Sequence, residues 1–310
     1  MSMSMDPDVA TILASWSPVD FVHPAVQRER VREARSALPP FVPRHGVRIE
    51  DAAVPRPDGD PVPIRVHRPA APDSSRGTLV WIHGGAYCIG AADHEDLICS
   101  ELSGRTGSTV VSVDYRLAPE HPFPAGFHDC VHVVEQVAAG ALTGVPSDRV
   151  AVGGTSAGAG LAAAVALDAR DRGGPDLAFQ LLLYPFIDDR RQGASFSTAA
   201  DAIVFNAEDA RIAWDHYLGT DRDEVPAYAA PTRATDVANL PAAYVLAAGL
   251  DCLRDDAVDH AVRMMRAGVD VELHVVPDVP HGFMSLAPTT PVAEATMNEI
   301  VRALDRALEG

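Results

Sequence analysis

Short apolar runs alternate with longer segments of helical periodicity along most of this chain. The apolar runs predict strands over residues 47–54, 62–67, 78–82, 109–113, 150–152, 179–184, 243–247 and 271–276. The helical periodicity predicts helices over about residues 26–35, 95–105, 125–139, 161–167, 209–218, 255–267 and 291–308. Runs that are apolar throughout, such as 78–82, are typical of strands covered on both faces. The alternation therefore predicts an α/β fold with a doubly wound, mostly parallel, eight-stranded sheet flanked by helices.

The first two predicted strands depart from parallel pairing. Residues 55–61, which separate them, read Pro-Arg-Pro-Asp-Gly-Asp-Pro and carry the residue types of a turn. A short turn joins neighbouring strands that run in opposite directions, so residues 47–54 and 62–67 are predicted to form an antiparallel hairpin.

Two segments stand outside the alternation. Residues 1–45 form an amphipathic, proline-interrupted stretch before the first strand, and both a lid over the domain and a mobile terminal arm remain open for it. Residues 187–235 are too long for a simple crossover between two sheet strands, and long insertions of this kind are lids or are disordered. The helical periodicity of 209–218 favours an ordered lid. We therefore expect cap segments at 1–45 and 187–235, and a catalytic domain made of 46–186 and 236–310.

Composition excludes several classes of partner. The 310 residues contain 43 Asp and Glu against 25 Lys and Arg, a net charge of −18, which argues against nucleic acid and anionic membrane surfaces. No apolar run approaches the roughly 18 residues that cross a bilayer, and the N-terminal residues lack the features of a signal peptide. Four scattered cysteines without metal-ligand spacing (Cys88, Cys99, Cys130 and Cys252) are interpreted as reduced thiols of a cytoplasmic protein without a metal site.

The stretch 150–161 carries the strongest chemical signal. It passes from an apolar strand through Gly154-Thr-Ser-Ala-Gly158 into an alanine-rich helix, which is the G-x-S-x-G pattern of a nucleophile elbow. Glycines on both sides of Ser156 permit the close backbone approach of such a sharp turn. By itself the pentapeptide also occurs by chance in Gly/Ser-rich loops, but the flanking strand and helix favour Ser156 as a nucleophile.

A serine nucleophile needs a base, and the base needs an orienting carboxylate. In elbow folds the acid and then the histidine follow the serine along the chain, after late strands. Asp251 follows the strand at 243–247 and His281 follows the strand at 271–276. Asp255 and Asp256 are competing acids, but they are predicted to lie in the first turn of the next helix. We therefore expect Ser156, Asp251 and His281 to be the catalytic residues.

Backbone donors for an oxyanion are expected after the strand at 78–82. Gly84 and Gly85 allow amides to face a cavity there, and the amide of Ala157 follows the nucleophile. His83 is expected to brace this loop rather than to titrate in catalysis. Without the elbow, the stretch would be interpreted as an ordinary turn at the end of a strand.

Together these motifs resemble the hormone-sensitive-lipase-like family of α/β-hydrolases, the bacterial family IV esterases, in the branch with a Gly-Thr-Ser-Ala-Gly elbow. The resemblance covers about residue 45 to the end of the chain, through His83-Gly-Gly-Ala86, Asp114-Tyr-Arg-Leu-Ala-Pro-Glu-His-Pro-Phe-Pro-Ala125, the elbow, Asp251-Cys-Leu-Arg-Asp255 and His281-Gly-Phe283. It implies an α/β-hydrolase fold with a helical cap, the same triad, no metal or organic cofactor, and a possible homodimer.

The sequence departs from the family pattern in three places. Ala86 replaces the third glycine of the oxyanion motif, so which loop amides bind the oxyanion is open, and Ala86 is itself a candidate donor. Thr155 stands where Asp is more frequent, and Cys252 where Pro is usual. Arg116 and Glu120 are expected to form a buried or half-buried polar network under the site.

The predicted function is hydrolysis of short- to medium-chain acyl esters by a carboxylesterase. Candidate pocket residues are Ala86, Tyr87, Phe205, Trp214 and Tyr217, and packing within the cap is the alternative for the aromatic residues of the inserted segment. An amidase, an arylformamidase or a lactonase with the same triad remains open. A ligand-binding receptor of the same fold is disfavoured because the triad is complete.

Overall fold

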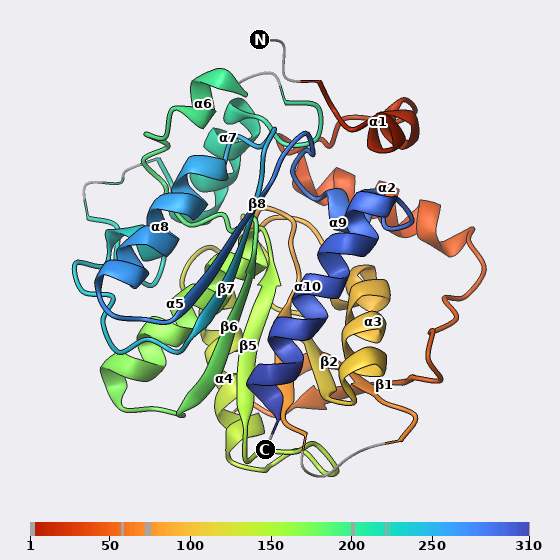
Figure 1. Cartoon of the computed structure of the whole chain (residues 1–310), viewed down its shortest axis with the longest axis vertical. Coiled ribbons are helices and arrows are strands. Elements are labelled where there is room, and N and C mark those ends of the chain that lie inside the picture. The colour runs from red at the N-terminus through yellow and green to blue at the C-terminus, as the bar shows by residue number, and fades with distance from the viewer. Residues whose placement is uncertain are drawn as a thin grey trace.

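A computed structural model describes residues 4–56, 59–71, 76–199, 202–220, 222 and 224–309. Its centre is one eight-stranded sheet in the order β1-β2-β4-β3-β5-β6-β7-β8 (Figure 1). The strands are β1 Arg48–Val54, β2 Val62–Arg68, β3 Thr78–Ile82, β4 Thr109–Val113, β5 Val150–Thr155, β6 Leu177–Leu183, β7 Ala243–Ala248 and β8 Val271–Val276. All eight predicted strands are present, so the predicted sheet is confirmed.

The pairing directions also agree with the sequence. β2 is antiparallel to β1 and to β4, whereas every pair from β4 to β8 is parallel. Part of the turn predicted between β1 and β2, residues 57 and 58, lies outside the described residues. β3 and β5 are buried along their whole length, as their apolar composition predicts.

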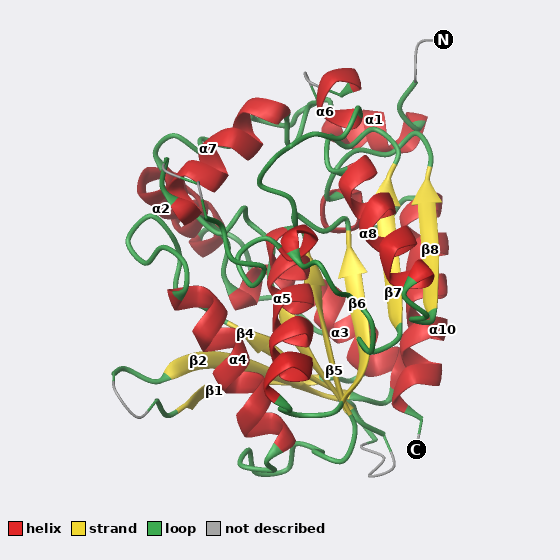
Figure 2. Cartoon of the chain, turned by 90° about the vertical axis from the view of Figure 1, so that its left-hand side faces the viewer, coloured by secondary structure: helices red, strands yellow, loops and turns green. Residues whose placement is uncertain are grey.

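Helices cover both faces of the sheet. α4 Ala125–Ala138, α5 Ala157–Arg172 and α8 Arg254–Arg266 lie on one face, and α3 Asp96–Thr106 and α10 Pro291–Leu308 on the other (Figure 2). Each face has its own hydrophobic core, because the strands present apolar side chains on both sides. No helix in the described ranges is long and apolar enough to cross a membrane.

The remaining helical elements are short or belong to the two segments outside the alternation. They are α1 Pro7–Leu13, α2 Pro24–Ser36, η1 Ala92–Glu95, α6 Ser195–Thr198, α7 Ala207–Leu218, η2 Pro231–Arg233 and α9 Phe283–Leu286. The periodicity predicted α2 and α7. It did not predict α1, α6 or α9, which are too short to show a clear period.

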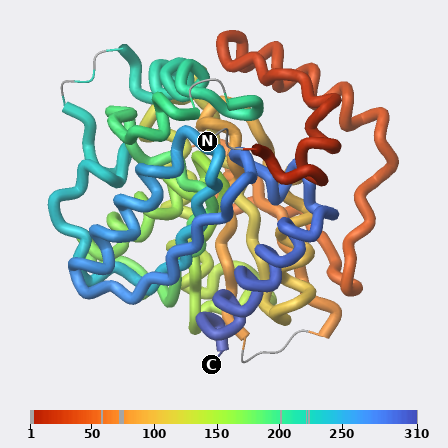
Figure 3. Tube along the Cα trace, turned by 45° about the horizontal axis from the view of Figure 1, so that its top comes forward, coloured from red at the N-terminus to blue at the C-terminus, as the bar shows by residue number. Residues whose placement is uncertain are grey.

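The N-terminal segment and the inserted segment lie at the same end of the molecule. α1, α2, α6 and α7 gather beyond the carboxyl ends of the parallel strands (Figures 2 and 3). Phe21 of the first segment and Phe205 of the second meet edge to face, with ring centroids 5.4 Å apart. Val9 and Leu13 of α1 are buried, so the described part of the N-terminal segment packs on the domain.

The strand order places a crevice where a site is expected. The chain passes from β3 to β4 on one side and later returns to β5 on the other side of β3. In open α/β sheets, ligands bind beyond the carboxyl ends of the strands where the order reverses in this way. The loop after β3 and the turn after β5 therefore meet at this edge.

Candidate active site

Ser156 occupies a strained turn between β5 and α5. Its backbone has φ 54° and ψ −118°, in the region of positive φ that residues other than glycine rarely adopt. The turn is held by its own backbone, since the Ser156 amide donates to the Leu183 carbonyl at 2.9 Å and the Ser156 carbonyl accepts from the Phe186 amide at 3.0 Å. The strand–turn–helix geometry predicted for the elbow is thus present.

The two glycines of the elbow are required by close packing against β3. A Cβ atom on Gly154 would lie 2.3 Å from the Ile82 carbonyl oxygen, and one on Gly158 would lie 2.0 Å from the same atom. Any larger residue would push the elbow away from β3. The G-x-S-x-G pattern therefore places Ser156 directly beside the loop that follows β3.

The structure brings the three predicted catalytic side chains together. His281 Nε2 lies 2.8 Å from Ser156 Oγ, and His281 Nδ1 lies 2.6 Å from Asp251 Oδ2. Asp251 is completely buried, and its other oxygen, Oδ1, accepts from the Leu253 amide at 2.9 Å. The competing Asp255 and Asp256 lie in the first turn of α8, as expected.

Aromatic rings shield His281 from solvent. The Tyr184 ring stands edge-on to the imidazole at a centroid distance of 5.0 Å, and the Phe205 ring lies 5.2 Å away. His281 and Ser156 are each only 7% exposed. A site from which water is largely excluded strengthens the electrostatic interactions among its polar groups.

The loop after β3 runs alongside the nucleophile. Gly85 has φ 120° and Ala86 has φ 54°, so Ala86 adopts a positive φ although it carries a methyl group. The Gly85 carbonyl accepts from the Cys88 and Ile89 amides, both at 2.9 Å, which closes a tight turn. Ala157, the other candidate oxyanion donor, begins α5 directly after Ser156.

His83 braces this loop, in agreement with its expected role. Its Nδ1 lies 2.7 Å from the Gly84 carbonyl, and its ring stacks on Tyr115 at a centroid distance of 4.3 Å. Burial lowers the pKa of His83, which keeps the ring neutral.

Comparisons with known proteins identify the family. The profile of the alpha/beta hydrolase fold matches residues 79–285. The chain is 37% identical to esterase LipI of Mycobacterium tuberculosis over 91% of this chain and 89% of the relative. It is also 37% identical to carboxylesterase NlhH of the same organism, over 98% of this chain and 96% of that relative. A solved structure of a bacterial heroin esterase superposes with a TM-score of 0.93 at 37% identity and covers 99% of both chains.

The chain belongs to the hormone-sensitive-lipase-like esterases of the α/β-hydrolase superfamily. The resemblance inferred from the motifs is thereby confirmed, and carboxylic ester hydrolysis is the class of reaction that these relatives share by name. Within the described residues, no group of three or more His, Cys, Asp and Glu side chains is placed to hold a metal ion.

A cavity of about 200 Å³ opens onto Ser156 in this esterase. Its apolar wall includes Trp16, Val19 and Phe21 from the N-terminal segment, Val204 and Phe205 from the inserted segment, and Tyr184 and Leu286 from the domain. Of the five predicted pocket residues, Ala86 and Phe205 line this cavity. A cap role was predicted for the N-terminal segment, but none of its residues was among the predicted pocket residues, because Trp16 and Phe21 are isolated aromatic residues in their stretch of the sequence.

The other three predicted pocket residues, Tyr87, Trp214 and Tyr217, do not line this cavity in the structure. Tyr87 stacks on Tyr217 at a centroid distance of 3.9 Å and also contacts Trp214 at 5.3 Å. The Tyr87 hydroxyl donates to the Phe186 carbonyl at 2.6 Å. All three aromatic residues are at most 3% exposed and form a packed cluster between α7 and the loop after β3.

The two polar residues predicted to form a network under the site, Arg116 and Glu120, each contact a charged partner. Arg116 Nε donates to the buried Asp129 of α4 at 2.8 Å. Glu120 is half exposed and pairs with Arg28 of α2. Arg28 Nη1 also donates to the Cys88 carbonyl at 2.7 Å, so this contact ties the N-terminal segment to the loop after β3.

Proposed function

We propose that this esterase is a serine carboxylesterase in which Ser156, His281 and Asp251 form the catalytic triad. The chain of contacts from Asp251 through His281 to Ser156, at 2.6 and 2.8 Å, is the observation that carries the proposal. Ser156 Oγ attacks the ester carbonyl while His281 Nε2 takes its proton. Asp251 accepts a hydrogen bond from the Nδ1–H of His281, holds the ring in this orientation and stabilises the imidazolium.

An acyl-enzyme then forms and is hydrolysed. His281 gives its proton to the leaving alcohol, and the acyl group remains on Ser156 Oγ. A water molecule, deprotonated by His281, attacks the acyl carbonyl and releases the acid. The apolar rings of Tyr184 and Phe205 beside His281 support this scheme, since they limit the access of bulk water to the site.

The oxyanion is proposed to bind backbone amides of Ala157 and of the loop 84–86. Gly84 and Gly85 are the expected loop donors. Ala86, which follows them in the loop, is the next candidate. Each such donor typically contributes about 3 kcal/mol of barrier lowering.

Short acyl esters are the substrates that fit best. The cavity of about 200 Å³ is smaller than the roughly 300–1,000 Å³ of typical ligand clefts. Its wall is mostly apolar, which suits the acyl chain of an uncharged ester. The N-terminal and inserted segments both contribute to that wall, which supports their assignment as a two-part cap.

The proposal is tested with p-nitrophenyl esters from acetate to octanoate. We expect initial rates to peak between acetate and butyrate, and an organophosphonate to attach to Ser156 in a one-to-one ratio. Matched p-nitroanilides and lactones are assayed in parallel, because an amidase, an arylformamidase or a lactonase would prefer them. The proposal would be contradicted if the protein turned over those substrates but no ester. It would also be contradicted if the wild-type protein neither turned over esters nor reacted with the phosphonate.

Shortening Phe21 is expected to shift the chain-length preference. Phe21 is buried against Phe205 in the cavity wall, so Phe21→Ala lengthens the space for the acyl chain. We expect the ratio of kcat/KM for p-nitrophenyl hexanoate over acetate to rise about tenfold, as small changes of apolar pockets do. Phe41→Ala is the matched control, because Phe41 lies in the same segment, is 39% exposed and is absent from this wall. If Phe21→Ala leaves this ratio unchanged, Phe21 does not limit the length of the acyl chain.

A further inference from the structure

We propose that Glu95 is a positioning residue that holds the loop 83–86 against the nucleophile elbow. The proposal rests on the proposed function, because it concerns the alignment of the oxyanion donors with Ser156. Glu95 ends η1 and is 9% exposed. It lines the cavity at Ser156 without being a member of the triad.

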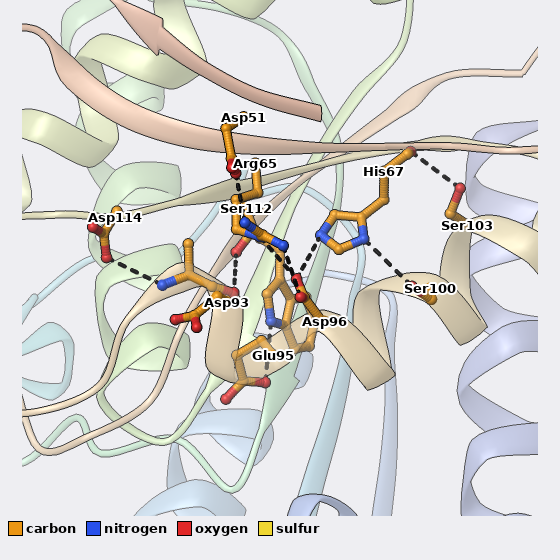
Figure 4. Close-up of polar contacts among 12 residues, drawn as sticks. Asp51, Arg65, His67, Asp93, Glu95, Asp96, Ser100, Ser103, Ser112 and Asp114 are labelled. Carbon is orange, nitrogen blue, oxygen red and sulfur yellow. Dashed lines mark hydrogen bonds and ion pairs between the residues drawn. The ribbon is translucent and has the colours of Figure 1, made fainter. Parts of the chain in front are cut away.

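Glu95 and its neighbour Asp96 are carboxylates with different surroundings. Asp96 accepts two hydrogen bonds from Arg65, at 2.9 and 2.8 Å, and lies 3.6 Å from His67 (Figure 4). The Glu95 side chain points away from Arg65 and His67 (Figure 4), and its carboxylate accepts from the Trp81 indole. Asp96 thus joins α3 to the sheet through the Arg65 guanidinium of β2, whereas Glu95 faces the cavity at Ser156.

Two donors from separate segments converge on the Glu95 carboxylate. The Thr155 hydroxyl donates to Oε1 at 3.2 Å, and the Trp81 indole Nε1 donates to Oε2 at 3.4 Å. Trp81 lies near the end of β3, and Thr155 directly precedes Ser156. One side chain therefore connects the strand to the elbow, and Gly84 of the oxyanion loop packs against the same Thr155 hydroxyl.

The connected atoms are in close packing. A Cβ atom on Gly84 would lie 2.9 Å from Thr155 Oγ1 and 3.4 Å from Ser156 Cβ. With the loop this close to the nucleophile, a small displacement of Gly84 or Thr155 changes the direction of the neighbouring amides relative to Ser156. A misplacement of about 1 Å can cost roughly 100-fold in rate.

Glu95 has no cationic partner that would explain its burial as an ion pair. In the described ranges of the chain it forms no ion pair with an Arg or a His, and its hydrogen-bond partners are the two neutral donors Trp81 and Thr155. Burial raises the pKa of Glu95. A neutral side chain of the same shape fits these contacts, since the amide group of Gln can accept from the Trp81 indole and donate to the rotatable Thr155 hydroxyl.

A purely space-filling role is the alternative that the experiment must separate. Glu95 also lines a neighbouring cavity of about 270 Å³, so removing its side chain could simply join two cavities. Glu95→Gln and Glu95→Leu both keep the volume close to that of Glu. Only Gln keeps the hydrogen bonds. Asp96→Asn is the matched control, because it changes the neighbouring carboxylate, which does not touch the loop or the elbow.

The test measures kcat and KM on p-nitrophenyl acetate, together with the Kd of an alkyl trifluoromethyl ketone, which forms a tetrahedral adduct with the serine. For Glu95→Leu we expect kcat to fall about 10- to 100-fold and KM to change less than about threefold, with binding of the ketone weakened in parallel with kcat. Glu95→Gln is expected to stay within about threefold of wild type. Asp96→Asn is expected to keep kcat even where it lowers the Tm.

Thr155→Val keeps the test informative if Glu95→Leu does not fold, since it removes the donated hydroxyl with little change in shape. We expect it to lower kcat in the same sense and, where Glu95→Leu folds, its effect not to add to that of Glu95→Leu. Two results would overturn the role of Glu95. One is that Glu95→Leu and Thr155→Val have the same kcat as the wild type. The other is that Glu95→Gln loses as much kcat as Glu95→Leu. A wild type that neither hydrolyses the ester nor reacts with the phosphonate would instead contradict the proposed function.

Discussion

Ser156→Ala is expected to lower kcat on p-nitrophenyl acetate by a factor on the order of 10⁴ or more. The substitution removes the oxygen that His281 Nε2 contacts at 2.8 Å, so no acyl-enzyme can form. The oxyanion donors and the cavity remain in place and leave a small residual rate. Steady-state kinetics gives the loss, and mass spectrometry after phosphonate treatment shows whether any adduct still forms.

Ser197→Ala is the control for this variant. Ser197 lies in α6 of the inserted segment and is exposed, away from the triad. We expect it to retain wild-type kcat and phosphonate labelling. A Ser156→Ala protein with the wild-type Tm that still hydrolyses the ester within about 100-fold of wild type would exclude Ser156 as the nucleophile.

The arrangement around Ser156 was predictable because it follows from local backbone rules. Glycine is required at 154 and 158 because a Cβ atom there would lie only 2.3 or 2.0 Å from the Ile82 carbonyl oxygen, so the pentapeptide itself carries the geometry. Asp251 and His281 were predictable for a different reason. Parallel strands end at one edge of a sheet, so residues that follow late strands meet there whatever their separation along the chain.

The pocket was less predictable because it depends on packing between segments that are distant in sequence. Trp214 and Tyr217 share one face of α7, and the sequence does not say which neighbour that face meets. The structure places Tyr87 there, so these rings stabilise the packing and do not line the cavity. The cavity wall comes instead from residues such as Trp16 and Phe21.

Glu95 illustrates the same limit for a polar residue. In the sequence it is one of several carboxylates at the start of a predicted helix, where Asp and Glu are common for reasons of the helix dipole. Nothing in its spacing distinguishes it from Asp96. The distinction appears only when β3, the oxyanion loop and the elbow are placed together around its side chain.

Asp251→Asn is expected to lower kcat at neutral pH by a factor of about 10⁴ without unfolding the protein. Asp251 Oδ1 accepts from the Leu253 amide at 2.9 Å, and an Asn that keeps this bond turns its NH₂ group toward His281 Nδ1. That NH₂ donates to Nδ1 and leaves the proton of the neutral ring on Nε2. His281 then cannot accept the Ser156 proton. Measurements of kcat and Tm across pH separate this loss from instability.

Asp256→Asn distinguishes this effect from a general need for acidic groups after β7. Burial, together with neighbouring carboxylates, raises the pKa of Asp256 to about 8, so this side chain is mostly neutral at pH 7 and Asn resembles it. We expect Asp256→Asn to keep kcat and Tm near the wild-type values. Comparable losses in the two variants would contradict Asp251 as the triad acid, whereas a loss confined to Asp251→Asn supports the orientation of His281 as its role.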